Sequence, residues 1–159
     1  IPEEIKKAAQ ICVEAGAKFV KTCTGFGPRG VEINDIKIIT TPVTHAVPTI
    51  GVAFEIEGIK ITFSSDTLYN KRLVEIAQDS HILVHEAFGT TEIKDLALRT
   101  KHGIAEDAGI VATESNAKSL VLVHPLPIYR EKVEDLIKEA KKHFEGPIKV
   151  PIELETIDI

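Results

Sequence analysis

Short apolar runs that end abruptly in polar residues constrain the fold of this chain most. The clearest is residues 59–63, whose alternating apolar side chains predict a β-strand and which Ser-Ser-Asp-Thr follows at residues 64–67. Asp66 therefore falls where a strand gives way to a loop. Proteins of the α/β class place reactive side chains at such points, because the sheet holds the side chain and the loop opens it to ligand.

Three histidines occupy comparable positions. His45 precedes a predicted strand pair, His102 stands at a predicted helix start, and His124 follows the apolar run 120–123. A carboxylate such as Asp66 can bridge two cations, and neutral imidazoles suit zinc, manganese or iron. A histidine that does not bind metal could act as a general acid or contact a phosphate. The four residues predict a metal or phosphate site, although any one of these histidines taken alone is more often a surface or capping residue.

The rest of the sequence alternates helical and strand patterns without an internal repeat or a linker, which indicates a single α/β domain over residues 1–159. Helices are predicted over residues 2–16, 70–78, 104–115 and 129–144. Strands are predicted over residues 17–22, 35–43, 49–56, 59–63, 82–84 and 120–123, with a closing strand or strand pair over 148–157.

Composition narrows the class of protein. The 159 residues are 43% hydrophobic and 27% charged, an ordinary balance for a domain with a buried core. No apolar run approaches the roughly 20 residues of a membrane helix and no signal peptide is visible, so we expect a cytoplasmic protein without a membrane partner. The net charge of −5 argues against nucleic-acid binding by bulk charge.

Three further features concern the origin of the chain. Two cysteines suit a reducing compartment. Abundant isoleucine, lysine and glutamate, with few thermolabile side chains, favour a thermophilic or engineered origin. Because the sequence has no methionine, we expect a fragment, a processed product or an engineered chain.

Five ordered motifs then carry a family resemblance. They are residues 43–51 (Val-Thr-His-Ala-Val-Pro-Thr-Ile-Gly), 63–67 (Phe-Ser-Ser-Asp-Thr), 83–87 (Leu-Val-His-Glu-Ala), 102–108 (His-Gly-Ile-Ala-Glu-Asp-Ala) and 122–125 (Leu-Val-His-Pro). In order and spacing they are similar to the ribonuclease Z-like branch of the metallo-β-lactamase superfamily, over about residues 31–159. The resemblance implies an αββα sandwich that hydrolyses phosphodiesters or other esters with a two-metal centre.

The same resemblance implies roles for five residues. His45 would bind one metal, His124 the other, and Asp66 would bridge them, while His102 would lie beside the scissile phosphate with Glu86 in support. The family's His-x-His-x-Asp-His motif, which supplies four further ligands, is absent from this sequence. We therefore expect half of the sandwich (a mixed sheet with flanking helices), at most one weakly bound zinc, and little or no turnover.

A half-sandwich also has consequences for partners. One sheet face would be bare, which favours a homo-oligomer. If the protein is active, the resemblance implies a small-molecule or phosphodiester substrate, with nucleic acid as one possibility.

The first thirty residues resemble a different family. Residues 15–30 (Ala-Gly-Ala-Lys-Phe-Val-Lys-Thr-Cys-Thr-Gly-Phe-Gly-Pro-Arg-Gly) are similar to deoxyribose-phosphate aldolase, a TIM-barrel enzyme, in which Lys21 would form a Schiff base. The family's second active-site lysine and later phosphate-binding glycines have no counterpart here. Three hypotheses follow: a metallo-β-lactamase-like hydrolase half-domain preceded by an aldolase-type helix–strand unit, as in a chimera; an aldolase-like protein acting through Lys21; or a non-catalytic structural protein.

Overall fold

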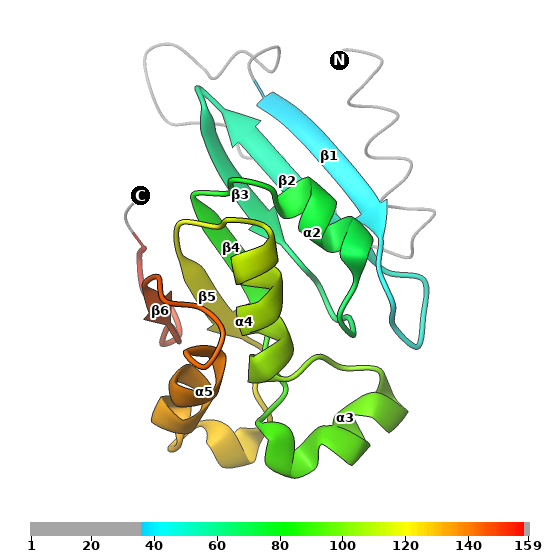
Figure 1. Cartoon of the computed structure of the whole chain (residues 1–159), viewed down its shortest axis with the longest axis vertical. Helices are drawn as coiled ribbons and strands as arrows, with labels where there is room; N and C mark the ends of the chain where they lie inside the picture. The colour runs from blue at the N-terminus through cyan, green and yellow to red at the C-terminus, as the bar shows by residue number, and fades with distance from the viewer. Residues whose placement is uncertain (1–35, 158–159) are drawn as a thin grey trace.

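A six-stranded mixed sheet organises the computed structural model, which describes residues 36–157 (Figure 1). Its strands lie side by side in chain order: β1 (Ile36–Pro42), β2 (Ile50–Ile56), β3 (Ile59–Phe63), β4 (Ile82–Glu86), β5 (Leu120–Val123) and β6 (Ile148–Lys149). The first three strands pair antiparallel, and β3 to β6 pair parallel. The predicted α/β class with a mixed sheet is confirmed.

The antiparallel pairing of β2 with β3 follows from the turn residues that connect them. Glu57 and Gly58 connect β2 to β3 with positive φ angles of 50° and 81°. Two such residues make the tight hairpin turn whose twist matches that of the strands. Ile56 consequently pairs with Ile59, and the apolar alternation of the two strands stays in phase. The predicted hairpin is confirmed.

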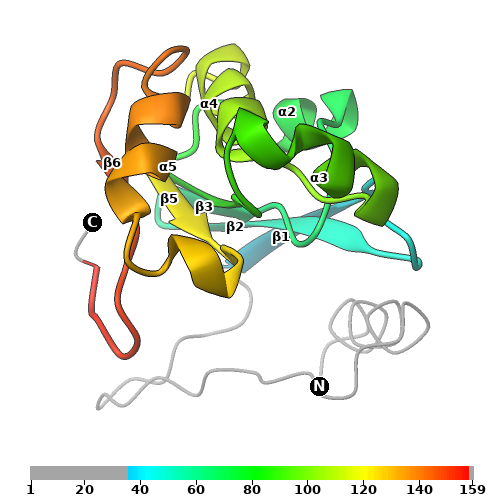
Figure 2. The same cartoon turned by 90° about the horizontal axis from the view of Figure 1, so that it is seen from below.

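The four α-helices within residues 36–157 lie on one side of this sheet (Figure 2). They are α2 (Lys71–Ala77), α3 (Lys94–Thr100), α4 (Ala105–Glu114) and α5 (Val133–Ala140), and two short 3₁₀ turns, η2 (Thr91–Ile93) and η3 (Pro127–Tyr129), precede α3 and α5. The core between helices and sheet is apolar, and its fully buried members include Leu73, Leu83, Val111, Leu120, Leu122 and Leu136. None of the described helices is long and apolar enough to cross a membrane.

Two predicted boundaries are wrong, and one helix was missed. The helix expected over residues 129–144 divides into η3 and α5, because Tyr129 packs into the core through the 3₁₀ turn before α5 begins at Val133. The closing strand expected over residues 148–157 is only β6, since Pro151 has no N–H to continue the ladder. Helix α3 was not predicted. The helix and strand expected over residues 2–22 lie outside the described residues.

The face opposite the helices carries a row of apolar side chains from five strands. Strand pairing and side-chain alternation assign to it Ile36, Ile38, Ile50, Val52, Phe54, Ile56, Ile59, Ile61, Phe63, Ile82, Val84, Val121 and Val123. We call this surface the open face, because no helix within residues 36–157 covers it (Figure 2). Ile38 and Phe63 are 44% and 41% exposed there.

Candidate metal centre

The candidate site lies where three parallel strands end. Asp66 follows β3, Glu86 is the last residue of β4, and His124 comes directly after β5. Because these strands run parallel, their carboxyl ends meet at one edge of the sheet. The sheet therefore brings together Asp66, Glu86 and His124, which lie far apart in sequence.

Two loops bring further histidines to the same edge. His45 comes from the connection between β1 and β2, and His102 from the residues after α3. His45, Asp66 and His102 each offer one ligand atom, and these three atoms lie within 4.8 Å of one another. The Asp66 Oδ2 atom is 3.9 Å from His45 Nε2 and 3.8 Å from His124 Nε2. The carboxylate thus stands within reach of both imidazoles.

Hydrogen bonds orient two of the imidazoles for metal binding. His45 Nδ1 lies 2.8 Å from the carbonyl oxygen of Lys101, and His102 Nδ1 lies 2.8 Å from Glu86 Oε2. A carbonyl oxygen only accepts, so His45 must carry its proton on Nδ1, which leaves the Nε2 lone pair free. Tetrahedral zinc with bonds of about 2.1 Å holds its ligand atoms about 3.4 Å apart. The Asp66 Oδ2 atom lies 3.9 Å from His45 Nε2 and 3.8 Å from His124 Nε2, distances that require only a small closure, so Asp66 paired with either imidazole fits such an ion.

Glu86 connects two parts of the site, Thr67 and His102, through its two carboxylate oxygens. Its side chain is almost fully buried, and Oε1 accepts a hydrogen bond from the backbone N–H of Thr67. Burial raises the pKa of Glu86 to about 7, while the backbone N–H groups of Thr67 and Gly103 oppose this rise; Asp66 raises the pKa further. Near neutral pH this carboxyl group can therefore hold or release a proton.

His102 is the central ring of the site. Phe88 stacks on it with ring centroids 4.3 Å apart and planes 7° apart, and the His124 ring lies 5.4 Å away. The His45 ring meets it edge-on at 4.8 Å. Burial lowers the pKa of His102, and His45 acts in the same direction, while Asp66 opposes them. The imidazole is therefore held in its neutral form, with Nε2 available.

The backbone around the site is unusual. Ser65, Lys101 and His124 have φ angles of 55°, 58° and 59°, in the left-handed region that residues other than glycine rarely adopt. Gly103 allows the closest approach of two loops, because a Cβ atom there would lie 2.7 Å from the Thr67 carbonyl oxygen. Such conformations typically cost on the order of 1–3 kcal/mol and gather at functional sites.

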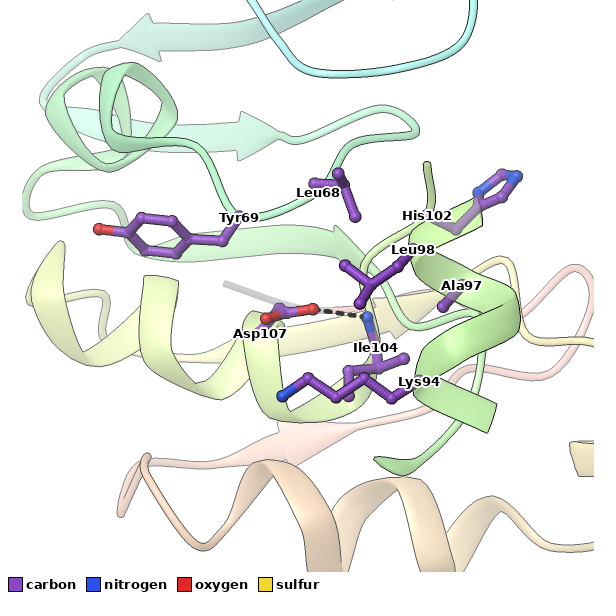
Figure 3. A pocket seen from close by; sticks show the side chains of 8 residues that line it. All are labelled: Leu68, Tyr69, Lys94, Ala97, Leu98, His102, Ile104 and Asp107. Atoms are coloured by element: carbon purple, nitrogen blue, oxygen red, sulfur yellow. Dashed lines mark hydrogen bonds between the residues drawn. The ribbon is translucent and has the colours of Figure 1, made fainter. Parts of the chain in front are cut away.

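Two cavities adjoin the cluster. One of about 150 Å³ lies between the strand ends and is lined by Phe63, Ser64, Ser65, Asp66, Val84, Glu86, Val123 and His124. The other, of about 120 Å³, is lined by Leu68, Tyr69, Lys94, Ala97, Leu98, His102, Ile104 and Asp107 (Figure 3). In the second cavity, Lys94 is paired with Glu106 and Asp107 accepts from the Ile104 N–H. That cavity therefore offers a ligand mainly apolar walls.

Sequence comparison gives a consistent family. The ribonuclease Z of Archaeoglobus fulgidus is 41% identical over 91 residues, which cover 57% of this chain and 30% of that protein. The ribonuclease Z of Natronomonas pharaonis is 29% identical over 154 residues, covering 97% of this chain and 47% of that protein. Most of this chain is homologous to ribonuclease Z-like proteins of the metallo-β-lactamase superfamily. It spans less than half the length of these curated relatives.

Structural comparison supports the same fold. The metallo-β-lactamase fold protein YhfI from Bacillus subtilis superposes with a TM-score of 0.67 at 20% identity, over 76% of this chain and 48% of that one. No family model matches the chain. The match to the Natronomonas ribonuclease Z extends into the first thirty residues, and nothing in these comparisons supports an aldolase-like segment or a chimera. Lys21 lies outside the described residues.

Sequence reasoning named five of the residues that the structure gathers here: His45, Asp66, Glu86, His102 and His124. It missed Phe88, which stacks on His102, and Thr67, whose N–H holds Glu86. No sequence signal separated Phe88 from an ordinary core aromatic, because its role depends on which ring the fold places against it.

Proposed function

We propose that this chain is a zinc-binding, phosphodiesterase-type half-domain, corresponding to the C-terminal half of a ribonuclease Z-like sandwich, with little or no turnover on its own. The observation that carries the proposal is the position of Asp66 Oδ2, within 4 Å of both His45 Nε2 and His124 Nε2. These three residues would hold one ion weakly. The relatives are named as ribonucleases, which supports a phosphodiester of RNA as the substrate class.

The chain's own residues would then serve proton transfer and orientation. A bound zinc would supply a polarised water and charge stabilisation at a phosphoryl oxygen. His102 Nε2 would take the proton that the attacking water releases and pass it to the leaving oxygen of the substrate. Glu86 Oε2 holds His102 through Nδ1, so it would fix the ring's orientation and stabilise the imidazolium that forms when His102 takes up a proton.

Zinc titration of chelator-treated protein by calorimetry tests the metal site. We expect one ion per wild-type chain and at least about a 100-fold loss of affinity in Asp66→Ala, because an ion ligand is removed. Asp95→Ala, in the first turn of α3, is the matched control and should bind as wild type does. If wild type and Asp66→Ala bind zinc equally, the assignment is wrong.

Hydrolysis of bis(p-nitrophenyl) phosphate separates the roles. We expect His102→Ala to retain zinc binding and to lose any measurable hydrolysis, since its proposed task is proton transfer. Loss of zinc binding in His102→Ala would instead make it an ion ligand. A wild-type protein that binds no zinc would support the non-catalytic hypothesis.

A further inference from the structure

The Phe88 ring that stacks on His102 is held through its backbone. The N–H of Phe88 donates to the carbonyl oxygen of Gly103 at 2.9 Å, and its own carbonyl oxygen accepts from the N–H of Leu126 at 3.0 Å. With both backbone groups bonded, the position of the stacked ring depends on the conformation of the residues that follow it in the chain.

The first two of these residues are held by Tyr129 of η3. A Cβ atom at Gly89 would lie 2.6 Å from Tyr129 Cε2, so the tyrosine ring packs directly on this backbone. The side chain of Thr90 is buried, and its hydroxyl oxygen lies 3.0 Å from the Tyr129 hydroxyl oxygen. The pair is shielded from water, which would otherwise compete for this hydrogen bond.

The third residue is held by Glu139 of α5. Its Oε1 atom accepts a hydrogen bond from the N–H of Thr91 at 2.6 Å, and its Oε2 atom lies 3.6 Å from Lys142 Nζ. Glu139 is 7% exposed, whereas the other charged side chains of α5 are exposed. A buried carboxyl group costs free energy unless it is paired, and an apolar side chain often stabilises such a position at least as well. Its bond to Thr91 therefore indicates that Glu139 serves the loop rather than the helix.

We propose that Glu139 is a positioning residue for His102. By holding the loop after Phe88, it keeps the Phe88 ring stacked on the imidazole. Glu86 fixes Nδ1 of this imidazole and Phe88 fixes its plane, so the two together aim Nε2. A misplacement of about 1 Å at a reacting group can cost on the order of 100-fold in rate. The inference rests on the role of His102 in the proposed function.

Nuclear magnetic resonance of the full 159-residue chain, without zinc or substrate, tests the proposal. A stacked aromatic ring shifts the C–H protons of an imidazole upfield, and Phe88→Leu measures how much of the His102 shift this ring supplies. We expect Glu139→Ala to lose most of that contribution, because the Thr91 N–H loses its acceptor. Glu139→Gln should retain it, since the amide oxygen can accept the same hydrogen bond.

Thr91→Pro removes the donor and leaves Glu139 in place. Thr91 is the first residue of η2, a position at which proline is tolerated. Thr90 before it has φ −100° and ψ 179°, the extended conformation that a following proline favours. This variant should lose the upfield shift as Glu139→Ala does, and it decides the question if Glu139→Ala does not fold.

Phe144→Leu is the matched control for loss of stability. Phe144 is 6% exposed, comparable with Glu139, but its ring packs against Gly146. It should destabilise the fold and leave the His102 shift unchanged. A shift retained in Glu139→Ala and Thr91→Pro overturns the inference, and so does an equal loss in Glu139→Gln or Phe144→Leu. Because neither zinc nor substrate is present, these outcomes are separate from the zinc titration that tests the proposed function.

Discussion

Leu83 and Val84 are neighbours on β4, yet they have opposite surroundings. Leu83 points to the helices and is fully buried, whereas Val84 points to the open face and lines the cavity beside Asp66. Both faces of the sheet are apolar, but the described helices cover only one of them. The helix-covered face should therefore carry most of the stability of the single chain, and the open face should depend on what binds it.

Substitution in the covered core gives the largest expected effect. Leu83→Ala should lower the free energy of unfolding by about 2–5 kcal/mol, because it leaves a cavity among fully buried neighbours. Val84→Ala, one residue away, should cost clearly less in dilute protein. Urea denaturation of both variants measures the difference, and equal losses would contradict the contrast between the two faces.

The pH dependence of stability should come next in size. Burial raises the pKa of Glu86 from 4.5 to about 7, so the folded metal-free protein holds this proton after the unfolded chain has released it. Stability should therefore fall as pH rises from about 4.5 to about 7, by up to about 3 kcal/mol. Urea denaturation in the presence of a chelator at several pH values measures this slope.

Glu86→Gln is the control for that slope. Burial lowers the pKa values of His85 and His102, so these residues act in the opposite sense and weaken the fold as pH falls through their range below 6.5. The glutamine variant keeps both histidines and removes only the contribution of Glu86. The difference between wild type and Glu86→Gln should therefore fall with rising pH, and a pH-independent difference would refute the assignment.

The same variant should leave zinc affinity nearly unchanged, because Glu86 orients His102 and the proposed ion ligands are His45, Asp66 and His124. Calorimetry on Glu86→Gln measures this. Removing the carboxylate that orients a metal-binding histidine typically costs about 10- to 100-fold in affinity, so a loss of that size would instead make His102 an ion ligand.

The smallest effect is expected on the open face. Ile59→Thr should change the unfolding free energy of the dilute chain by less than about 1 kcal/mol, because Ile59 is 37% exposed. Urea denaturation measures this change, and a loss as large as that of Leu83→Ala would contradict the contrast between the two faces.

Much of the fold was predictable because local chemistry decides it. Turn residues and apolar alternation specify the β2–β3 hairpin, and a continuous apolar run specifies β5. Asn70 marks the start of α2 by accepting hydrogen bonds from Arg72 and Leu73. Helix α3 escaped prediction, because its seven residues are too few to display a helical repeat. The end of the chain escaped it too, where β6 stops after two residues.

For the site, the sequence by itself determined that Asp66 and His124 directly follow strands. The parallel pairing of β3, β4 and β5, which brings these two residues and Glu86 to one edge, belongs to the tertiary structure. Side-chain alternation along β4 places Glu86 on the same side of the sheet as Val84. It places His85 on the helix-covered side, where His85 is fully buried. Only the tertiary structure decided that Lys101 and Glu86 orient two imidazoles, that Phe88 stacks on His102, and that the open face stays uncovered by residues 36–157. These features depend on contacts between segments distant in sequence, which no local pattern encodes.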